Sequence, residues 1–470
     1  MRLARSTGPL DIGLALGLGG FAALLVTSLP MIVALFFAVA LVALATTTRF
    51  DVGQVGSSLV LLTSFTIPMN RLFPGAIPIP ASDFFLVAAV GVYLLMRLVE
   101  QRSSEEQTYR TIFIALGVIS LGGLVGALFE TAGPFMYKAL GVPNRDVSGW
   151  GPNLGNLMKF ILGSFLPMAL WALVRPNRKF MVRIVNAFFA GCTFSALIGL
   201  TLPYGRGGAR AIGVTVHPNQ FGSLSLMGIG AGLGLLLSGR LRPWALPAFP
   251  ILALGILQSG SRAALGGLAV LALIVGPMTR DRRVFGGLAL GLAAVLMVFA
   301  TGVIQPSGED ALGRTFGDSS TAVGSGAIRD DLAERVFDRW QERPVTGQGF
   351  NYMRPSHNVY LGLITSAGVL GVLGFAVLVG AIVRRVWRQR DDMLTLGVAA
   401  GYFAYLANAY FDNIFWWRWL WFYVGLVVAV TATAERRKAD AAEADAAEAD
   451  AQAEELLRPA PTDVGASSTR

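Results

Sequence analysis

Long apolar stretches alternate with short polar segments along most of the chain. A helix needs about 20 mostly apolar residues to cross the hydrocarbon core of a bilayer. We therefore predict an all-α polytopic membrane protein with about 14 transmembrane helices, at residues 10–29, 31–47, 54–69, 83–98, 111–129, 153–174, 183–201, 216–237, 244–260, 262–278, 284–305, 357–383, 393–410 and 418–434.

The composition agrees with a membrane protein and excludes several other classes. Of the 470 residues, 54% are hydrophobic and 14% are charged, whereas soluble proteins carry about 25% charged residues. Cys192 is the single cysteine and there are two histidines, which excludes an intramolecular disulfide and a zinc site built from cysteines or three histidines. The chain contains no GxxxxGK[ST] loop, so ATP-driven transport is not expected.

The positive charges predict which side of the membrane each loop occupies. If the N-terminus is cytoplasmic, 24 of the 38 lysines and arginines lie in the inside segments. This bias follows the positive-inside rule, and an even number of spans places both termini in the cytoplasm. The net charge of +9 therefore reflects topology, and no nucleic-acid partner is expected.

One predicted outside segment, residues 306–356, is long and unusually basic. Its six arginines are Arg314, Arg329, Arg335, Arg339, Arg343 and Arg354. Residues 328–342 have the pattern of a helix with an apolar stripe, and the turn 346–350 after Pro344 is expected to be flexible. Acidic residues accompany the arginines from Arg335 to Arg343 at helical spacing, which favours a salt-bridged surface. Arg314 and Arg329 are better candidates for binding an external anion.

Further polar residues lie where the chain enters or leaves the membrane on the outside. His357 begins a span, and an imidazole suits a general base because its pKa is close to neutrality. Arg262 follows Ser-Gly-Ser in a tight turn, where a guanidinium grips phosphate bidentately or reaches the headgroups. His217 and Asn219 flank Pro218 at another helix start, as acceptor contacts or structural support.

Two other predicted outside features have either a structural or a functional interpretation. Residues 411–423 are rich in aromatic side chains, which favours a belt at the membrane interface, with sugar stacking as the alternative. Asp83 opens a span and could neutralise an outside arginine. The arginines and His357 together suit a membrane lipid that carries a diphosphate.

At these residues the chain resembles a known family. His357-Asn358, nine residues, Gly368, two residues and Gly371 are similar to the signature of the bacterial O-antigen ligase and polymerase family. Residues 259–265 resemble its Ser-Arg step, and residues 329–350 its arginine-led loop helix with a Gly-x-Gly turn. The resemblance covers roughly residues 205–385, and Val372 stands where ligases often have threonine.

The resemblance implies a GT-C-like glycosyltransferase of the bacterial cytoplasmic membrane with an extracytoplasmic active site. It would transfer a glycan from undecaprenyl diphosphate to a glycan, lipid or protein acceptor, without a metal or other cofactor. His357 would be the catalytic base, or would at least position the acceptor. Arg262 and Arg329, assisted by Arg314, would bind the diphosphate, with Asn358 as support.

Two other function classes and a domain division complete the expectations. A flippase or exporter of lipid-linked saccharides would use the same arginines without chemistry, and has little need of His357. A membrane scaffold would use the acidic tail for docking. We divide the chain into N-terminal spans at 1–204, a ligase/polymerase-like core at 205–434 with the loop 306–356, and an acidic, disordered or loosely helical tail at 435–470.

Overall fold

The computed structural model describes twelve segments of the chain. These are residues 52–69, 80–100, 106–129, 150–202, 206–207, 210–279, 311, 314, 320–352, 357–411, 415 and 417–457. The predicted spans at 10–29, 31–47 and 284–305 lie outside the described residues.

The described chain is helical apart from one two-stranded hairpin. In chain order the elements are α3 (Val52–Thr66), α4 (Ala81–Glu100), α5 (Glu106–Leu128), α7 (Trp150–Val174), α8 (Arg178–Thr201), β1 (Arg206–Gly207), β2 (Arg210–Ala211), α9 (Pro218–Leu237), η2 (Pro243–Ala245), α10 (Ala248–Gln258), α11 (Arg262–Thr279), α14 (Ser320–Glu342), η3 (Phe350–Tyr352), α15 (Val359–Arg388), α16 (Met393–Asn408) and α17 (Arg418–Leu457). The eleven predicted spans within the described segments all fall on helices, which confirms the all-α class.

The predicted number of fourteen spans is not confirmed. In the described part of the chain, six helices are long and apolar enough to cross a membrane, namely α4, α5, α7, α8, α9 and α15. The apolar helices α3, α10, α11 and α16 are shorter. A helix of about 15 residues is only about 22 Å long, less than the hydrocarbon core of about 30 Å. The described residues therefore support six full-length crossings, and the number of fourteen stays a prediction.

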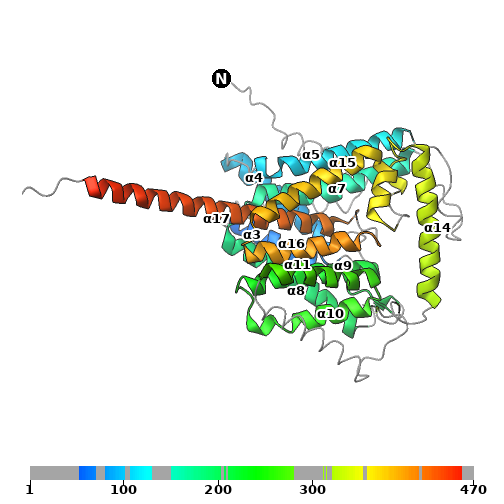
Figure 1. Cartoon of the computed structure of the whole chain (residues 1–470), viewed down its shortest axis with the longest axis horizontal. Helices are drawn as coiled ribbons and strands as arrows, with labels where there is room; N and C mark the ends of the chain where they lie inside the picture. The colour runs from blue at the N-terminus through cyan, green and yellow to red at the C-terminus, as the bar shows by residue number, and fades with distance from the viewer. Residues whose placement is uncertain are drawn as a thin grey trace, which may run out of the picture.

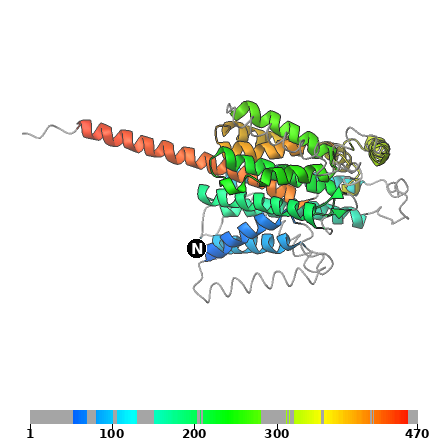
Figure 2. The same ribbon diagram turned by 90° about the horizontal axis from the view of Figure 1, so that it is seen from below.

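The bundle has two distinct ends. α14 stands across one end, roughly perpendicular to the bundled helices (Figure 1), and is seen end-on in the orthogonal view (Figure 2). The C-terminal half of α17 projects from the opposite end. We name these the α14 end and the tail end.

Glycine pairs allow α9 and α16 to pack closely. A Cβ on Gly230 would lie 2.6 Å from Cα of Gly401, and one on Gly397 would collide with the backbone of Gly234. Each helix thus presents two glycines four residues apart, the spacing that lets membrane helices approach at their backbones. The glycine run of α9 serves helix packing, as its position within a span predicts.

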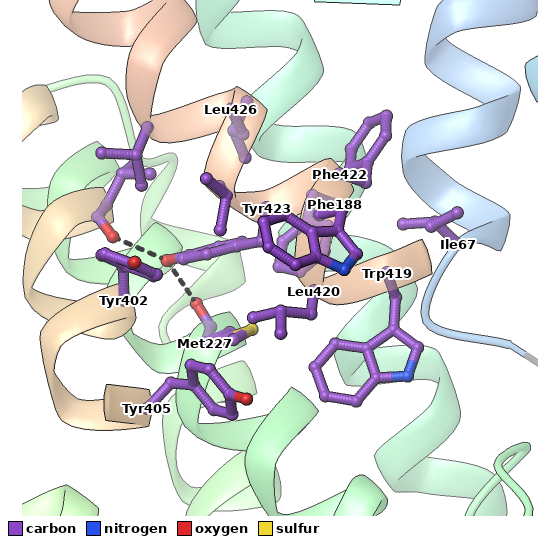
Figure 3. Close-up of a cluster of buried hydrophobic side chains, with 14 of the residues drawn as sticks. Ile67, Phe188, Met227, Tyr402, Tyr405, Trp419, Leu420, Phe422, Tyr423 and Leu426 are labelled. Atoms are coloured by element: carbon purple, nitrogen blue, oxygen red, sulfur yellow. Dashed lines mark hydrogen bonds between the residues drawn. The ribbon is translucent and has the colours of Figure 1, made fainter. Parts of the chain in front are cut away.

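The aromatic segment near residue 420 forms core rather than a surface belt. Trp419, Trp421 and Tyr423 are at most 1% exposed. The Tyr423 hydroxyl donates to the carbonyls of Met227 and Val398 at 3.1 and 2.9 Å (Figure 3). The predicted interface belt is therefore wrong for these residues, because their rings are buried between helices. Tyr423 lies against α8, α9 and α16, and Trp421 lies against Phe160 of α7.

Charged residues join the helices at the tail end. Arg178 forms a bidentate pair with Asp392 at 2.6 and 3.0 Å. Arg436 donates to the Pro176 carbonyl at 2.7 Å, and Arg385 lies 3.6 Å from Glu435. Beyond these anchors α17 continues as a helix to Leu457, with exposed side chains over residues 439–453, so the acidic tail is helical over its described length.

Candidate functional site

Several helix ends that carry predicted site residues lie at the α14 end. α10 ends at Gln258 and α11 begins at Arg262, so the predicted tight turn between them is confirmed. α9 begins at Pro218 and α15 at Val359. Helix starts expose backbone N–H groups and favour negative charge, which suits a site for an anion.

Arg210 on β2 connects two of these helix ends. Its Nε donates to the Ser259 carbonyl at 2.7 Å, and its Nη2 donates to Oδ1 of Asn219 at 3.0 Å. The β1–β2 hairpin pairs Gly207 with Arg210 and holds the arginine between the two acceptors. One guanidinium thus links the α10–α11 turn to the first turn of α9.

The two serines of the Ser-Gly-Ser-Arg turn have structural roles. Ser259 Oγ accepts from the Ser261 N–H at 3.1 Å, and Ser261 Oγ accepts from the Ala264 N–H at 3.3 Å. Gly260 has a φ of +63°, in the left-handed region that favours glycine. The turn places Arg262 at the first position of α11, where its side chain is exposed.

His217 caps α9 and is held in one tautomer. Its Nδ1 accepts a hydrogen bond from the Asn219 N–H at 3.2 Å, which leaves the ring proton of the neutral form on Nε2. The pKa of His217 is lowered to about 4, mainly by desolvation of the ring by its neighbours, although the residue as a whole is exposed. Three neighbouring groups act in the same direction: Arg210, His357 and Arg329. At neutral pH His217 is therefore an uncharged hydrogen-bond donor.

The same electrostatic interactions show which predicted residues the fold brings together. His217 precedes α9, Arg329 lies on α14, and His357 precedes α15. These segments are far apart in the sequence, yet their charged groups lie close enough to act on one imidazole. Asn219 joins the group through Arg210.

The backbone at His357 is set by the start of α15. His357 is half-buried and has a φ of +45°, which is uncommon for a residue other than glycine. Asn358 Oδ1 caps the helix by accepting from the N–H groups of Tyr360 and Leu361 at 2.9 and 3.1 Å. The Val359 N–H donates to a carbonyl at the end of α16 at 2.9 Å. Asn358 thus fixes the helix start beside His357 and acts as structural support.

The turn after α14 is held by a kink in α15. Gly368 has a φ of 57° and a ψ of −150°, which interrupts the helix. The N–H groups of Gln348 and Gly349 donate to the carbonyls of Thr365 and Ser366 at 2.7 and 2.9 Å. In return, the Val369 N–H donates to the Val345 carbonyl at 3.1 Å. The turn that we expected to be flexible is therefore ordered. The kink leaves backbone N–H and carbonyl groups of α15 without partners within the helix, and the turn forms hydrogen bonds with them.

A buried asparagine of α7 holds the same turn from the other side. Asn153 Nδ2 donates to the Gln348 carbonyl at 3.2 Å, and its Oδ1 accepts from the Asn351 N–H at 3.2 Å. Phe350 packs against Phe160, with tilted rings whose centroids are 5.0 Å apart. The turn connects α14 to α5, α7 and α15, and so fixes one end of α14.

The arginines on the exposed face of α14 pair with acids, as the sequence predicts. Arg335 pairs with Asp331, and Arg339 pairs with Glu342, each at 3.0 Å. This confirms the salt-bridged surface on α14. Arg314 is buried rather than exposed, and the nearby Ala311 packs against the end of α10. The predicted role of Asp83 as a counter-ion is confirmed by its ion pair with Arg418.

Sequence reasoning missed Arg210 and Asn153. Arg210 stands in a short outside segment, seven residues before His217. Proximity to a histidine at a helix start is a weak signal, and the contact with Ser259 spans 49 positions. Among the described residues, no three His, Cys, Asp or Glu side chains form a group that could hold a metal ion. The expected independence from metals stays a prediction.

The comparison with known protein families supports the resemblance. The O-antigen ligase family matches residues 247–376 of the chain. This range includes Arg262, Arg314, Arg329 and His357. It is narrower than the predicted 205–385 and excludes Arg210, His217 and Asn219. No curated protein matches the chain. Residues 247–376 are thus an O-antigen ligase family domain, carried by a multi-pass membrane protein with transmembrane helices.

Proposed function

We propose that the protein transfers a glycan from undecaprenyl diphosphate to an acceptor hydroxyl during the synthesis of a surface polysaccharide. The family of residues 247–376 implies enzymatic transfer of a glycan. The observation that carries the finer proposal is the convergence of His217, Arg329 and His357 at the α14 end. Arg262 begins α11 at that same end.

His357 is proposed as the base of the reaction. The acceptor oxygen attacks the anomeric carbon of the donor glycan, and the bond from that carbon to the diphosphate oxygen breaks. His357 takes the proton of the acceptor hydroxyl, so that the oxygen gains charge as the new bond forms. A half-buried position next to a rigid helix cap supports this role, because it fixes the imidazole relative to the bound donor.

The arginines are proposed to stabilise the leaving group. Undecaprenyl diphosphate departs with both electrons of the broken bond and therefore gains negative charge. Guanidinium groups of Arg262 and Arg329 bind phosphate oxygens bidentately and offset this charge. The neutral His217 adds a hydrogen-bond donor without further positive charge. Arg314 assists from a buried position.

We place the α14 end outside the cytoplasmic membrane and both termini in the cytoplasm. The distribution of lysine and arginine over the loops supports this orientation. The acceptor then reaches His357 from the extracytoplasmic side. It is a lipid-linked core sugar, a growing polysaccharide chain or a protein hydroxyl.

Purified protein in detergent tests the proposal. The substrates are an undecaprenyl-diphosphate oligosaccharide and a panel of the three acceptor classes, with EDTA present. We expect release of undecaprenyl diphosphate that depends on the acceptor. Saturable binding of the donor without release in the presence of any acceptor would instead favour a flippase or exporter.

Arg262→Lys is expected to weaken binding of undecaprenyl diphosphate about tenfold, although the charge is kept. Lysine cannot form the two parallel hydrogen bonds of a guanidinium. The measurement is a titration of the purified variant with undecaprenyl diphosphate in detergent. Arg335→Lys on the salt-bridged face of α14 is the matched control and should bind as the wild type does. Equal affinities of Arg262→Lys and the wild type would remove Arg262 from the donor site.

Truncation after Lys438 is expected to leave transfer and thermal stability unchanged. Residues 439–453 of the removed part are exposed, while the anchors to Arg385 and Pro176 lie before the cut. Truncation after Ala434 also removes these anchors and should lower the unfolding temperature of the protein. If the shorter deletion abolishes transfer by stable protein, the scaffold interpretation gains support.

A further inference from the structure

We propose that Arg210 is a positioning residue of the transfer site, which holds the turn that carries Arg262 and the cap of α9 at a fixed separation. The link between this role and glycan transfer rests on the proposed function, whereas the contacts of Arg210 do not depend on it. Arg210 lies outside the matched family range of residues 247–376.

The first contact acts on Arg262. Arg210 Nε donates to the Ser259 carbonyl at 2.7 Å. Ser259 Oγ in turn accepts from the Ser261 N–H at 3.1 Å, and Ser261 caps the first turn of α11. Arg262 is the first residue of α11, so its backbone follows directly from this turn. Fixing the Ser259 carbonyl therefore fixes the backbone from which the Arg262 side chain extends.

The second contact acts on His217. Arg210 Nη2 donates to Oδ1 of Asn219 at 3.0 Å, and Asn219 is buried. The Asn219 N–H donates to Nδ1 of His217 at 3.2 Å and sets the orientation of the ring. Arg210 and His217 are thus joined through one buried asparagine. A planar guanidinium can hold both acceptors at once, whereas an ammonium acts as a point charge.

The charge of Arg210 has a separate effect. The groups whose charge acts on His217 come from three segments: Arg210 on β2, Arg329 on α14 and, in its protonated form, His357 before α15. Desolvation of the ring and these charges lower the pKa of His217. Removal of one charge should raise the pKa of His217 toward the ordinary value of about 6.5. A lysine at position 210 keeps the positive charge but cannot hold the Ser259 carbonyl and Asn219 Oδ1 at the same time. The electrostatic effect on His217 can therefore be separated from the positioning effect on the helix ends.

Histidine NMR measures the electrostatic effect without any substrate. The chain has only two histidines, so protein labelled with ¹³C at histidine Cε1 gives two signals, which His357→Gln assigns. In the wild type, we expect the His217 signal to stay at its neutral position from pH 8 to pH 5. In Arg210→Gln the onset of its titration should move to higher pH than in the wild type, whereas in Arg210→Lys it should not. Arg335→Gln is the control for loss of a distant arginine on an exposed surface.

Titration with undecaprenyl diphosphate measures the positioning effect. Both Arg210→Gln and Arg210→Lys should bind about tenfold more weakly than the wild type, because each loses a two-point hydrogen-bonded link. Wild-type affinity in both variants, or a His217 titration in Arg210→Gln equal to that of the wild type, would overturn the role of Arg210. If the wild type transfers no glycan but the variants change His217 and donor affinity as stated, the proposed function fails and the role of Arg210 stands.

Discussion

Replacement of His357 by alanine is expected to lower glycan transfer by about 10²- to 10⁴-fold, the contribution of a positioned general base. The acceptor hydroxyl is a poor nucleophile until its proton is removed. His217 cannot take over this task, because its pKa of about 4 makes it a weak base. Release of undecaprenyl diphosphate by purified protein, measured with saturating donor and acceptor, checks the expectation.

The controls for this variant separate chemistry from folding and binding. His357→Ala should keep the unfolding temperature of the wild type, since Asn358 rather than His357 caps α15. It should also keep the affinity for undecaprenyl diphosphate within a small factor. Transfer by His357→Ala at the wild-type rate would show that another group accepts the proton.

Replacement of Gly368 by alanine should destabilise the protein by about 3 kcal/mol or more, through backbone strain and steric overlap. At a φ of 57° and a ψ of −150°, any side chain is strained. A Cβ at this position would also collide with the carbonyl group of Val345. The turn after α14 would then lose its backbone hydrogen bonds to α15. The unfolding temperature in detergent and the transfer rate should both fall.

Gly380 provides a matched control on the same helix. A Cβ at Gly380 meets no atom within 4 Å, and alanine is favoured over glycine within a helix. Gly380→Ala should therefore be as stable as the wild type or slightly more stable. Equal unfolding temperatures for Gly368→Ala and Gly380→Ala would contradict the proposed locking of the turn.

The sequence predicts local features of the fold well because they depend on neighbouring residues. Apolar stretches separated by polar segments define the helices. Ser-Gly-Ser before Arg262 defines a tight turn, and the acids near Arg335 and Arg339 define a salt-bridged face. The glycine run of α9 indicates close helix packing for the same reason.

Features that depend on distant contacts were not predicted. The aromatic segment near Trp421 has the composition of both a core and an interface belt, and only the neighbouring helices decide between them. The kink at Gly368 becomes evident only when residues 345–349 lie against it. Arg210 resembles any other loop arginine until its contacts with Ser259 and Asn219 are known.

The most direct test of a transferase at the α14 end uses proteoliposomes that contain a fluorescent undecaprenyl-diphosphate oligosaccharide. Two quantities are measured on the same vesicles: release of undecaprenyl diphosphate after addition of acceptor, and movement of the intact donor between leaflets. We predict acceptor-dependent release by the wild type, its loss in His357→Ala, and no movement above that of empty vesicles. Movement of the intact donor at equal rates in the wild type and His357→Ala, without release, would contradict the account and identify a transporter.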